Sequence, residues 1–278
     1  MNILKKKWVK KSFKVVAVLL ICIILFTGAN HFTQHYIAHI KPYFTPKYYD
    51  KIELTEQTDL KTIFLQTGIG EKTAEKMIKD GRFEEILEAQ EDFFGFYDVE
   101  CNPMIKWFTR EERLKDESYR LYDLQPGDIL VTLSTHTWGW RHGHSGLVYD
   151  EFSVIESIAI GVDSSKENIF YWKDYAGVAV LRVKDKTLEE RKKVAEFAFE
   201  NLTDRPYSLF AGLGFKKAPA LDNLKLHCSY LPWYAWQHFG VDLDSDKGRI
   251  VTSYDILHSD KVEIVQLYGM DPSEFIKK

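Results

Sequence analysis

Cysteine is scarce in this chain, with three residues among 278. Three cysteines are too few for a disulfide scaffold. Cys22 lies inside an apolar run, where a thiol behaves as a small hydrophobic side chain. Cys101 and Cys228 remain, and in an oxidising compartment these two either pair with each other or stay free as thiols.

The chain also lacks a large charge excess, internal repeats and low-complexity segments. Its 37 basic and 41 acidic residues give a net charge of −4, so no global basic surface is available to attract nucleic acid. With 45% hydrophobic and 28% charged residues, the composition is typical of a folded globular protein. The length allows one substantial domain and a smaller one.

A basic N-terminus precedes an unbroken apolar run at residues 15–26. This order is typical of an export signal whose N-terminus stays inside the cell. We therefore expect a basic cytoplasmic segment at residues 1–14, a membrane helix at 15–32 and a stalk or linker at 33–58. The basic residues are Lys5, Lys6, Lys7, Lys10, Lys11 and Lys14.

Either an intact anchor or a cleaved signal fits this apolar segment. Thr27-Gly28-Ala29 resembles a small-residue cleavage site, whose use would release a secreted protein. The helix-compatible sequence continues to Ile40, ahead of Pro42, and this favours an intact anchor. We therefore predict a single-pass protein of the cell membrane whose folded domains lie outside the cytoplasm.

Residues 59–120 are expected to form a small helical domain. Apolar residues at helical spacing predict two short helices joined by the turn Thr67-Gly68-Ile69-Gly70, and a third helix at residues 83–94. The turn resembles the hairpin of helix-hairpin-helix modules, in which glycine amides hold a DNA phosphate. A membrane-anchored DNA-binding protein is therefore an alternative, which the acidic surroundings disfavour. The acidic residues are Glu71, Glu75, Glu84, Glu85, Glu88 and Glu91.

From residue 121 to residue 278 the pattern indicates an α+β domain. Segments rich in β-branched and apolar residues predict strands, and amphipathic periodicity predicts helices between them. We therefore expect an antiparallel sheet packed on helices. The expected strands lie at 129–133, 145–149, 152–156, 177–183 and 262–267, and the expected helices at about 188–201 and 228–239.

Cys228 lies just ahead of the second of these helices. Because proline is tolerated only in the first helical turn, Pro232 places the helix start close to Cys228. Free N–H groups at a helix start stabilise the thiolate, which is the nucleophilic form of cysteine. Cys228 is therefore the candidate nucleophile, with an inert buried thiol as the alternative.

A base for this thiol is expected from the strand that contains His144. Small residues flank His144 and leave its ring accessible. A hairpin turn at residues 149–151 would pair Val148 with Phe152. That antiparallel register places His144 opposite Glu156, which would complete a Cys-His-Glu triad. An exposed Glu156 without this role is the alternative.

Six short motifs follow one another between residues 124 and 265. They are Leu124-Gln125-Pro126-Gly127-Asp128-Ile129-Leu130, His144-Ser145-Gly146-Leu147-Val148, Val154-Ile155-Glu156-Ser157, Arg205-Pro206-Tyr207, His227-Cys228-Ser229 and Val251-Thr252-Ser253-Tyr254-Asp255-Ile256-Leu257. In this order, with the histidine before the cysteine, they resemble the circularly permuted NlpC-type branch of papain-like cysteine hydrolases, which includes YiiX-like proteins and relatives of lecithin:retinol acyltransferase. The resemblance implies a permuted papain-like fold and acyl transfer through the cysteine.

Substrate and cofactor expectations follow from this resemblance and from the export signal. An exported location makes a cell-wall peptide amide the first choice, and a lipid N-acyl amide or ester the second. The chain departs from the family at Tyr230-Leu231-Pro232, where a polar or acidic residue is common after the cysteine, so the substrate stays open. No cofactor is expected. The expected substrate contacts are Tyr207, Ser145, Trp140 and His142.

A metal site is a further alternative. His142 and His144 lie on one strand face, and His227 adjoins Cys228. Together these four side chains would offer three nitrogens and one sulfur to an ion. Zinc sites usually contain more closely spaced ligand pairs, so we favour the triad.

Overall fold

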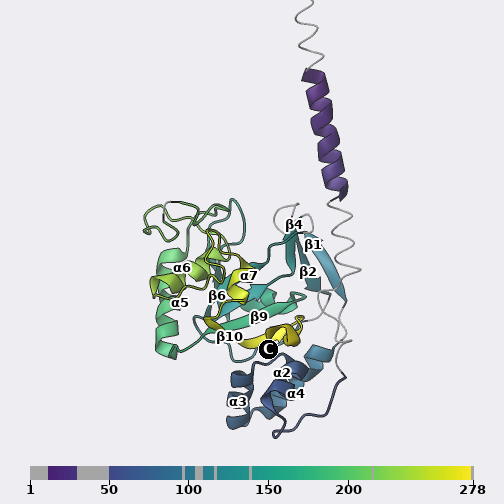
Figure 1. The fold of residues 1–278 in the computed structure, drawn as a ribbon, viewed down its shortest axis with the longest axis vertical. Helices are drawn as coiled ribbons and strands as arrows, with labels where there is room; N and C mark the ends of the chain where they lie inside the picture. The colour runs from purple at the N-terminus through teal and green to yellow at the C-terminus, as the bar shows by residue number, and fades with distance from the viewer. Residues whose placement is uncertain are drawn as a thin grey trace, which may run out of the picture.

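An apolar helix stands at the N-terminal end of the chain (Figure 1). It spans Ser12–Ala29, and its 18 residues extend for about 27 Å, close to the thickness of a bilayer's hydrocarbon core. The helix therefore fits a membrane anchor or a signal sequence. Residues 30–49, which hold the end of the expected span and most of the expected stalk, lie outside the described residues. The structure, a computed structural model, describes residues 12–29, 50–95, 98–103, 109–115, 118–137, 140–214 and 216–276.

The centre of the fold is a six-stranded sheet in which every neighbouring pair of strands is antiparallel. The strand order is β10-β9-β3-β6-β7-β8, so the last strand of the chain forms one edge. Helices pack on this sheet, which confirms the predicted α+β class. The strands are β3 (Ile129–Thr132), β6 (His144–Asp150), β7 (Ser153–Glu156), β8 (Ser165–Asn168), β9 (Val178–Val183) and β10 (Val262–Tyr268).

Both faces of the sheet are buried, which explains the continuous apolar runs of its central strands. Successive side chains of a strand point to opposite faces. Val131 and Leu147 accordingly belong to one core with helices α5 and α6, whereas Leu130 and Val148 belong to a second core with Trp172. The helices are α5 (Leu188–Leu202) and α6 (Tyr230–His238), and Trp172 lies in the short helix η2 (Ile169–Asp174).

Three helices near the N-terminal side of the domain dock on the edge strand β10 (Figure 1). The Gly70 N–H donates to the Val265 carbonyl at 2.9 Å, and the Gly68 carbonyl accepts from the Leu267 N–H at 2.8 Å. A Cβ on Gly70 would lie 1.8 Å from the Ile264 carbonyl oxygen, so only glycine allows this approach. The helices are α2 (Leu60–Thr67), α3 (Glu71–Lys79) and α4 (Phe83–Phe94), and α4 has the predicted bounds.

This docking occupies the hairpin amides that suggested a phosphate site. The Gly68 N–H donates to the Phe64 carbonyl at 2.9 Å, and the Ile69 N–H donates to the Thr67 hydroxyl at 3.0 Å. With the Gly70 amide bound to β10, none of the three is left for a ligand. The observation that motivated the DNA-binding alternative is therefore lost, and we do not propose that function.

A second sheet, which the sequence does not predict, has the strand order β1-β2-β4-β5. Two of its strands lie before residue 120 and two lie after it, so this sheet joins the segments expected to form separate domains. Where the domain boundary lies stays a prediction. The end of the expected stalk also packs on the helices, since Leu54 is buried and the Gln90 side chain donates to the Ile52 carbonyl at 3.0 Å. The strands are β1 (Val99–Pro103), β2 (Thr109–Leu114), β4 (Thr135–Thr137) and β5 (Trp140–Arg141).

Replacing Gly70 with alanine tests the docking of the three helices on β10. The added methyl group would overlap the Ile264 carbonyl oxygen, so we expect a loss of about 1–3 kcal/mol of stability. Thermal denaturation of the full chain in detergent should show the midpoint lowered by several degrees, at roughly 2–4 °C per kcal/mol. Gly214→Ala is the control, because its Cβ would meet only the Lys216 carbonyl at 3.8 Å. Equal midpoints for the two variants would contradict the docking.

Candidate active site

Cys228 lies directly before the N-cap residue of α6, where the sequence predicts a helix start. Ser229 is the N-cap, and its hydroxyl donates to the Val251 carbonyl at 2.9 Å. The Leu231 N–H donates to the His227 carbonyl at 3.1 Å, which closes the turn that carries the thiol. Cys228 as a residue is half-buried, and it lies at the positive end of a helix, which stabilises a thiolate.

His144 and Glu156 are in direct contact. His144 opens β6, and Glu156 ends β7. The Nε2 atom of His144 lies 2.5 Å from Oε2 of Glu156, and the two residues are 3% and 0% exposed. The imidazole also stacks on Trp172, with ring centroids 5.4 Å apart and planes 20° from parallel. One ring nitrogen is thus held by a carboxylate, which leaves Nδ1 for the thiol.

The contact forms in a register different from the predicted one. Val148 pairs with Val154 rather than with Phe152, so the predicted pairing is wrong by two residues. A shift of two keeps every side chain on the same face. Glu156 therefore still reaches His144, now as its diagonal neighbour across the strand pair.

Gly146 stands between these two side chains on β6 and leaves the space that the contact needs. Continuing the observed register, Gly146 is the residue opposite Glu156. A Cβ on Gly146 would lie 2.5 Å from Val154 Cγ2 and 3.3 Å from Trp172 Cζ2. Without a side chain at this position, Trp172 can pack below the His144 ring.

The electrostatics of the site favour a charged Cys-His pair. Burial lowers the pKa of His144, but hydrogen bonds from Cys228 and Glu156 outweigh it and raise the pKa to about 10. Burial raises the pKa of Cys228, and hydrogen bonds from His144 and His227 bring it well below its ordinary value. Such an arrangement holds a thiolate beside an imidazolium, the form in which a cysteine attacks a carbonyl.

A short parallel bridge holds Tyr207 beside the segment that leads to Cys228. Residue 207 pairs with Leu226, and the Ser208 N–H donates to the Leu226 carbonyl at 2.7 Å. Burial and the nearby charge of Cys228 raise the pKa of Tyr207 above its ordinary value. Its hydroxyl therefore stays protonated and can donate a hydrogen bond at neutral pH.

The other expected substrate contacts have partners within their own strands and loops or on α7 (Ser253–Leu257), and their role in substrate binding stays a prediction. Ser145 is fully buried, and its hydroxyl donates to Ser253 at 2.9 Å, so it fixes β6 to α7. His142 uses Nε2 on the Thr137 hydroxyl at 3.1 Å and Nδ1 on the Gly143 carbonyl at 2.9 Å. Trp140 is 69% exposed, and its ring lies at the edge of the His142 ring.

A second Cys-His-Glu group occurs in the four-stranded sheet. Cys101 Sγ lies 3.7 Å from His136 Nε2, which lies 3.7 Å from Glu112 Oε1. Arg141 binds both oxygens of Glu112, at 2.8 and 2.6 Å. Burial and Arg141 lower the pKa of His136 to about 4, and burial and Glu112 raise the pKa of Cys101 to about 11. This thiol is therefore neutral.

Cys101 and Cys228 are both free, so the alternative in which they form a disulfide is wrong. The predicted metal alternative also loses support, because Glu156 holds His144 and His142 is bonded within its own hairpin. Among the described residues, the side chains grouped closely enough for an ion are three carboxylates whose ligand atoms lie within 4.8 Å of one another. Lys217 already neutralises one of them, Asp244. The three are Asp244, Asp246 and Asp255.

His227 belongs to the site and is absent from the predicted triad. It is 6% exposed, and its Nδ1 accepts a hydrogen bond from the Tyr230 N–H at 3.3 Å. From the sequence, His227 is predicted only as a possible metal ligand. Its position beside the nucleophile, three residues before a free helix amide, is the signal that could have assigned it.

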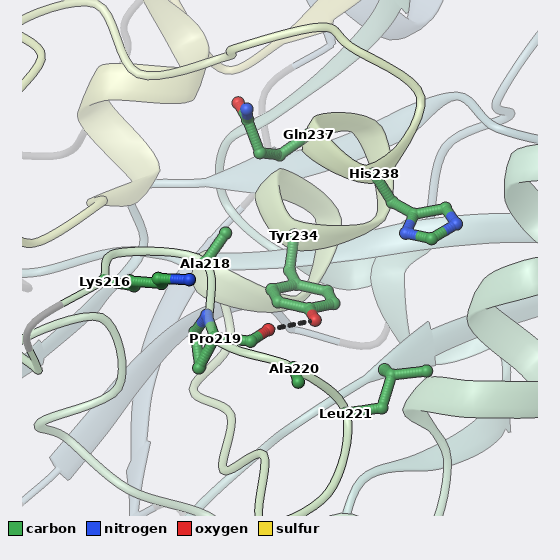
Figure 2. A pocket seen from close by; sticks show the side chains of 8 residues that line it. All are labelled: Lys216, Ala218, Pro219, Ala220, Leu221, Tyr234, Gln237 and His238. Carbon is green, nitrogen blue, oxygen red and sulfur yellow. Dashed lines mark hydrogen bonds between the residues drawn. The ribbon is translucent and has the colours of Figure 1, made fainter.

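An open cavity of 360 Å³ runs along α6 and the loop at residues 216–221 (Figure 2). Tyr234, Gln237 and His238 line one side, and the Tyr234 hydroxyl donates to the Pro219 carbonyl at 2.6 Å. The cavity lining includes neither Cys228 nor its two partners. It is therefore a concavity separate from the thiol.

Comparisons with known proteins say little about this chain. No family model matches it, and no curated protein matches it. A solved structure, the metalloprotein YiiX from Escherichia coli O157:H7, is similar to it at 14% identity and a TM-score of 0.39. That similarity covers 52% of this chain and 97% of YiiX. The chemistry of the site must therefore be judged from its own geometry.

Alkylation should distinguish the two Cys-His-Glu groups. At pH 6 we expect iodoacetamide to modify Cys228 at least about tenfold faster than Cys101, because the pKa of Cys228 is lowered and the pKa of Cys101 is raised. Both residues are half-buried, so accessibility does not predict this difference. Mass spectrometry of the two cysteine peptides after timed quenching measures the rates. Similar rates would contradict the charged Cys228-His144 pair.

Proposed function

We propose that the chain is a membrane-anchored cysteine hydrolase that cleaves an amide bond through Cys228, His144 and Glu156. The observation that supports this most is the buried 2.5 Å contact between His144 and Glu156 beside a thiol at a helix start. A nucleophile, a base and a group that orients the base are the three parts that acyl transfer through cysteine requires.

The proposed reaction has two stages. The Cys228 proton passes to Nδ1 of His144, the thiolate attacks the carbonyl carbon, and His144 returns the proton to the leaving amine. Water then attacks the thioester, giving one proton to His144, and the acid is released as that proton returns to the sulfur. Glu156 keeps Nε2 of His144 occupied, so that Nδ1 faces the thiol throughout.

The start of α6 offers donors for the oxyanion. Among the described residues, the backbone N–H groups of Cys228 and Ser229 make no hydrogen bond within the chain. Both residues precede Tyr230, the first helical residue, so neither N–H group has an acceptor within the helix. Preorganised amides of this kind stabilise the charge that develops on the carbonyl oxygen.

The order of these elements supports a permuted papain-like fold as part of the proposal. His144 lies on a central strand and precedes Cys228, which lies at the start of a helix packed on the same sheet. This is the order of the family that the sequence motifs resemble. The N-terminal apolar helix and the lysines before it support an extracytoplasmic site, where a cell-wall peptide amide is the first substrate candidate.

Exposed apolar side chains near the site favour a second candidate, a lipid with an N-acyl amide or ester. Leu209 and Phe210 are exposed just after Tyr207, and Ile250 is exposed just before Val251. The two loops lie side by side, because a Cβ on Gly212 would be 3.2 Å from the Arg249 carbonyl oxygen. An apolar rim of this kind suits an acyl chain.

Removing the sulfur tests the proposed hydrolase directly. Cys228→Ala should abolish hydrolysis of cell-wall peptides and of acyl amides while the fold stays intact, because it removes the proposed nucleophile and Cys101, the other thiol beside a histidine, keeps its proton. The measurement is product release from both substrate classes by the detergent-solubilised full chain. Cys101→Ala is the matched control and should keep its activity. Hydrolysis that survives in the Cys228 variant would rule out this mechanism.

A surface substitution separates the two substrate candidates. If an acyl lipid is the substrate, Phe210→Ser should raise KM for the micellar lipid about tenfold or more, because about 1.5–3 kcal/mol of apolar burial is lost. Hydrolysis of a soluble peptide should then be absent or unaffected. Phe152→Ser is the control, since Phe152 is 60% exposed but lies in the turn at the far end of β6. Equal KM values for the two variants would favour the peptide substrate.

A further inference from the structure

The His227 ring is held in one orientation with one nitrogen already occupied. The Tyr230 N–H donates to Nδ1 at 3.3 Å. The Ser229 hydroxyl lies 3.4 Å from the same nitrogen, but its single proton is donated to the Val251 carbonyl at 2.9 Å. Nδ1 is therefore an acceptor, and this hydrogen-bond network assigns the ring proton to Nε2.

The other nitrogen, Nε2, is buried, and no nitrogen or oxygen of the described residues accepts from it. Nε2 of His227 makes no hydrogen bond of full geometry with the described residues. Buried polar groups without partners are rare in folded proteins, and at functional sites they often await a ligand or a charge. The polar atom that this ring acts on is the sulfur of the next residue, Cys228.

We propose that His227 is a second catalytic histidine, whose Nε2–H donates a hydrogen bond to the Cys228 thiolate. This inference rests on the proposed function. The sulfur would then lie between two imidazoles of different roles. Donors at such sites are often poorly aligned in the free protein and tighten when the charge forms.

The two histidines cannot exchange these roles. His144 has a buried carboxylate, Glu156, which stabilises the charge that it gains when it accepts the thiol proton. His227 has no such carboxylate among its described contacts. Its Nδ1 accepts from the Tyr230 amide, and its Nε2 carries the ring proton. His144 is therefore the base, and His227 donates a hydrogen bond without transferring a proton.

The other titratable groups at the sulfur do not replace this donor. Tyr207 faces Cys228 from the loop before it, and burial with the Cys228 charge raises its pKa, so it stays neutral in the acidic range. Glu156 acts on Cys228 only through His144. Below neutral pH, the fraction of thiolate thus depends on the two imidazoles.

Two substitutions at residue 227 separate the donor from the acceptor. Asparagine places an oxygen near the Nδ1 position, so His227→Asn keeps the bond from the Tyr230 amide and loses the donor. Glutamine reaches the Nε2 position with an N–H, so His227→Gln keeps the donor. The probe is iodoacetamide, applied to the full chain in detergent from pH 4 to pH 10, with alkylation of Cys228 followed by mass spectrometry.

The comparison is made at or below the pH at which half of Cys228 is thiolate in the unmodified protein. There we expect His227→Asn to react about tenfold more slowly than the unmodified protein, and His227→Gln to react within about threefold of it. At pH 9, where Cys228 is ionised in all three proteins, the asparagine variant should react as fast as the unmodified protein or faster, because a less stabilised thiolate is more nucleophilic. A merely structural role for His227 would not produce this crossing of the rates.

Two results would overturn the proposal, and a third concerns the enzyme itself. An asparagine variant with the unchanged pH profile, or a larger loss in the glutamine variant than in the asparagine variant, would leave His227 as a helix cap only. By contrast, a Cys228 of the unmodified protein that titrates like an ordinary thiol, near pH 8.5, would overturn both the proposed function and this inference. The pH profile of the unmodified protein therefore distinguishes the two failures.

Discussion

The buried contact between His144 and Glu156 is the interaction on which the site depends. Two ionisable side chains in an apolar sheet are costly unless each satisfies the other, and removing one partner of such a pair costs about 3–5 kcal/mol. The fold meets this constraint by placing both on one face of β6 and β7. Trp172 closes the space below them, and Gly146 makes room for that ring. The His144 imidazole is thereby held in one orientation by the protein itself.

Two hydrogen bonds help to bring the Cys228 segment to His144, although Cys228 lies 84 positions after it in the sequence. Ser145, next to the base, donates to Ser253 at the start of α7. Two residues earlier, the Val251 carbonyl accepts from Ser229, next to the nucleophile. The residues adjacent to the thiol and to the imidazole are thus fastened to the same short segment. Small shifts of this segment would change the distance between sulfur and ring.

The two Cys-His-Glu groups of the chain show that composition alone does not make a reactive thiol. In both groups a cysteine, a histidine and a buried carboxylate lie close together. Around Cys101 the carboxylate of Glu112 is bound by Arg141, so it cannot stabilise a charged imidazole, and the thiol keeps its proton. Around Cys228 no guanidinium competes in the described contacts, and the carboxylate acts on the base. The two groups therefore differ in the partner of the glutamate, which is Arg141 for Glu112 and His144 for Glu156.

The sequence by itself determined the elements whose signal is local. Amphipathic spacing places α4 and α5, Pro232 sets the start of α6, and the apolar run gives the N-terminal helix, because each depends on neighbours within a few residues. The strand face of Glu156 was predictable for the same reason, since side chains alternate along a strand.

Only the tertiary structure decided what depends on distant partners. The register of β6 and β7 differs by two residues from the predicted one, because the strand pair contains a bulge between Val148 and Asp150 ahead of a two-residue turn. The short strands β1 and β2 have no local signal and exist through their pairing with each other and with β4. The glycine hairpin serves docking on β10 rather than ligand binding, and the His227 ring takes its orientation from a helix amide. In each case the residues can be named from the sequence, but the contacts that decide what they do form only between segments that folding brings together.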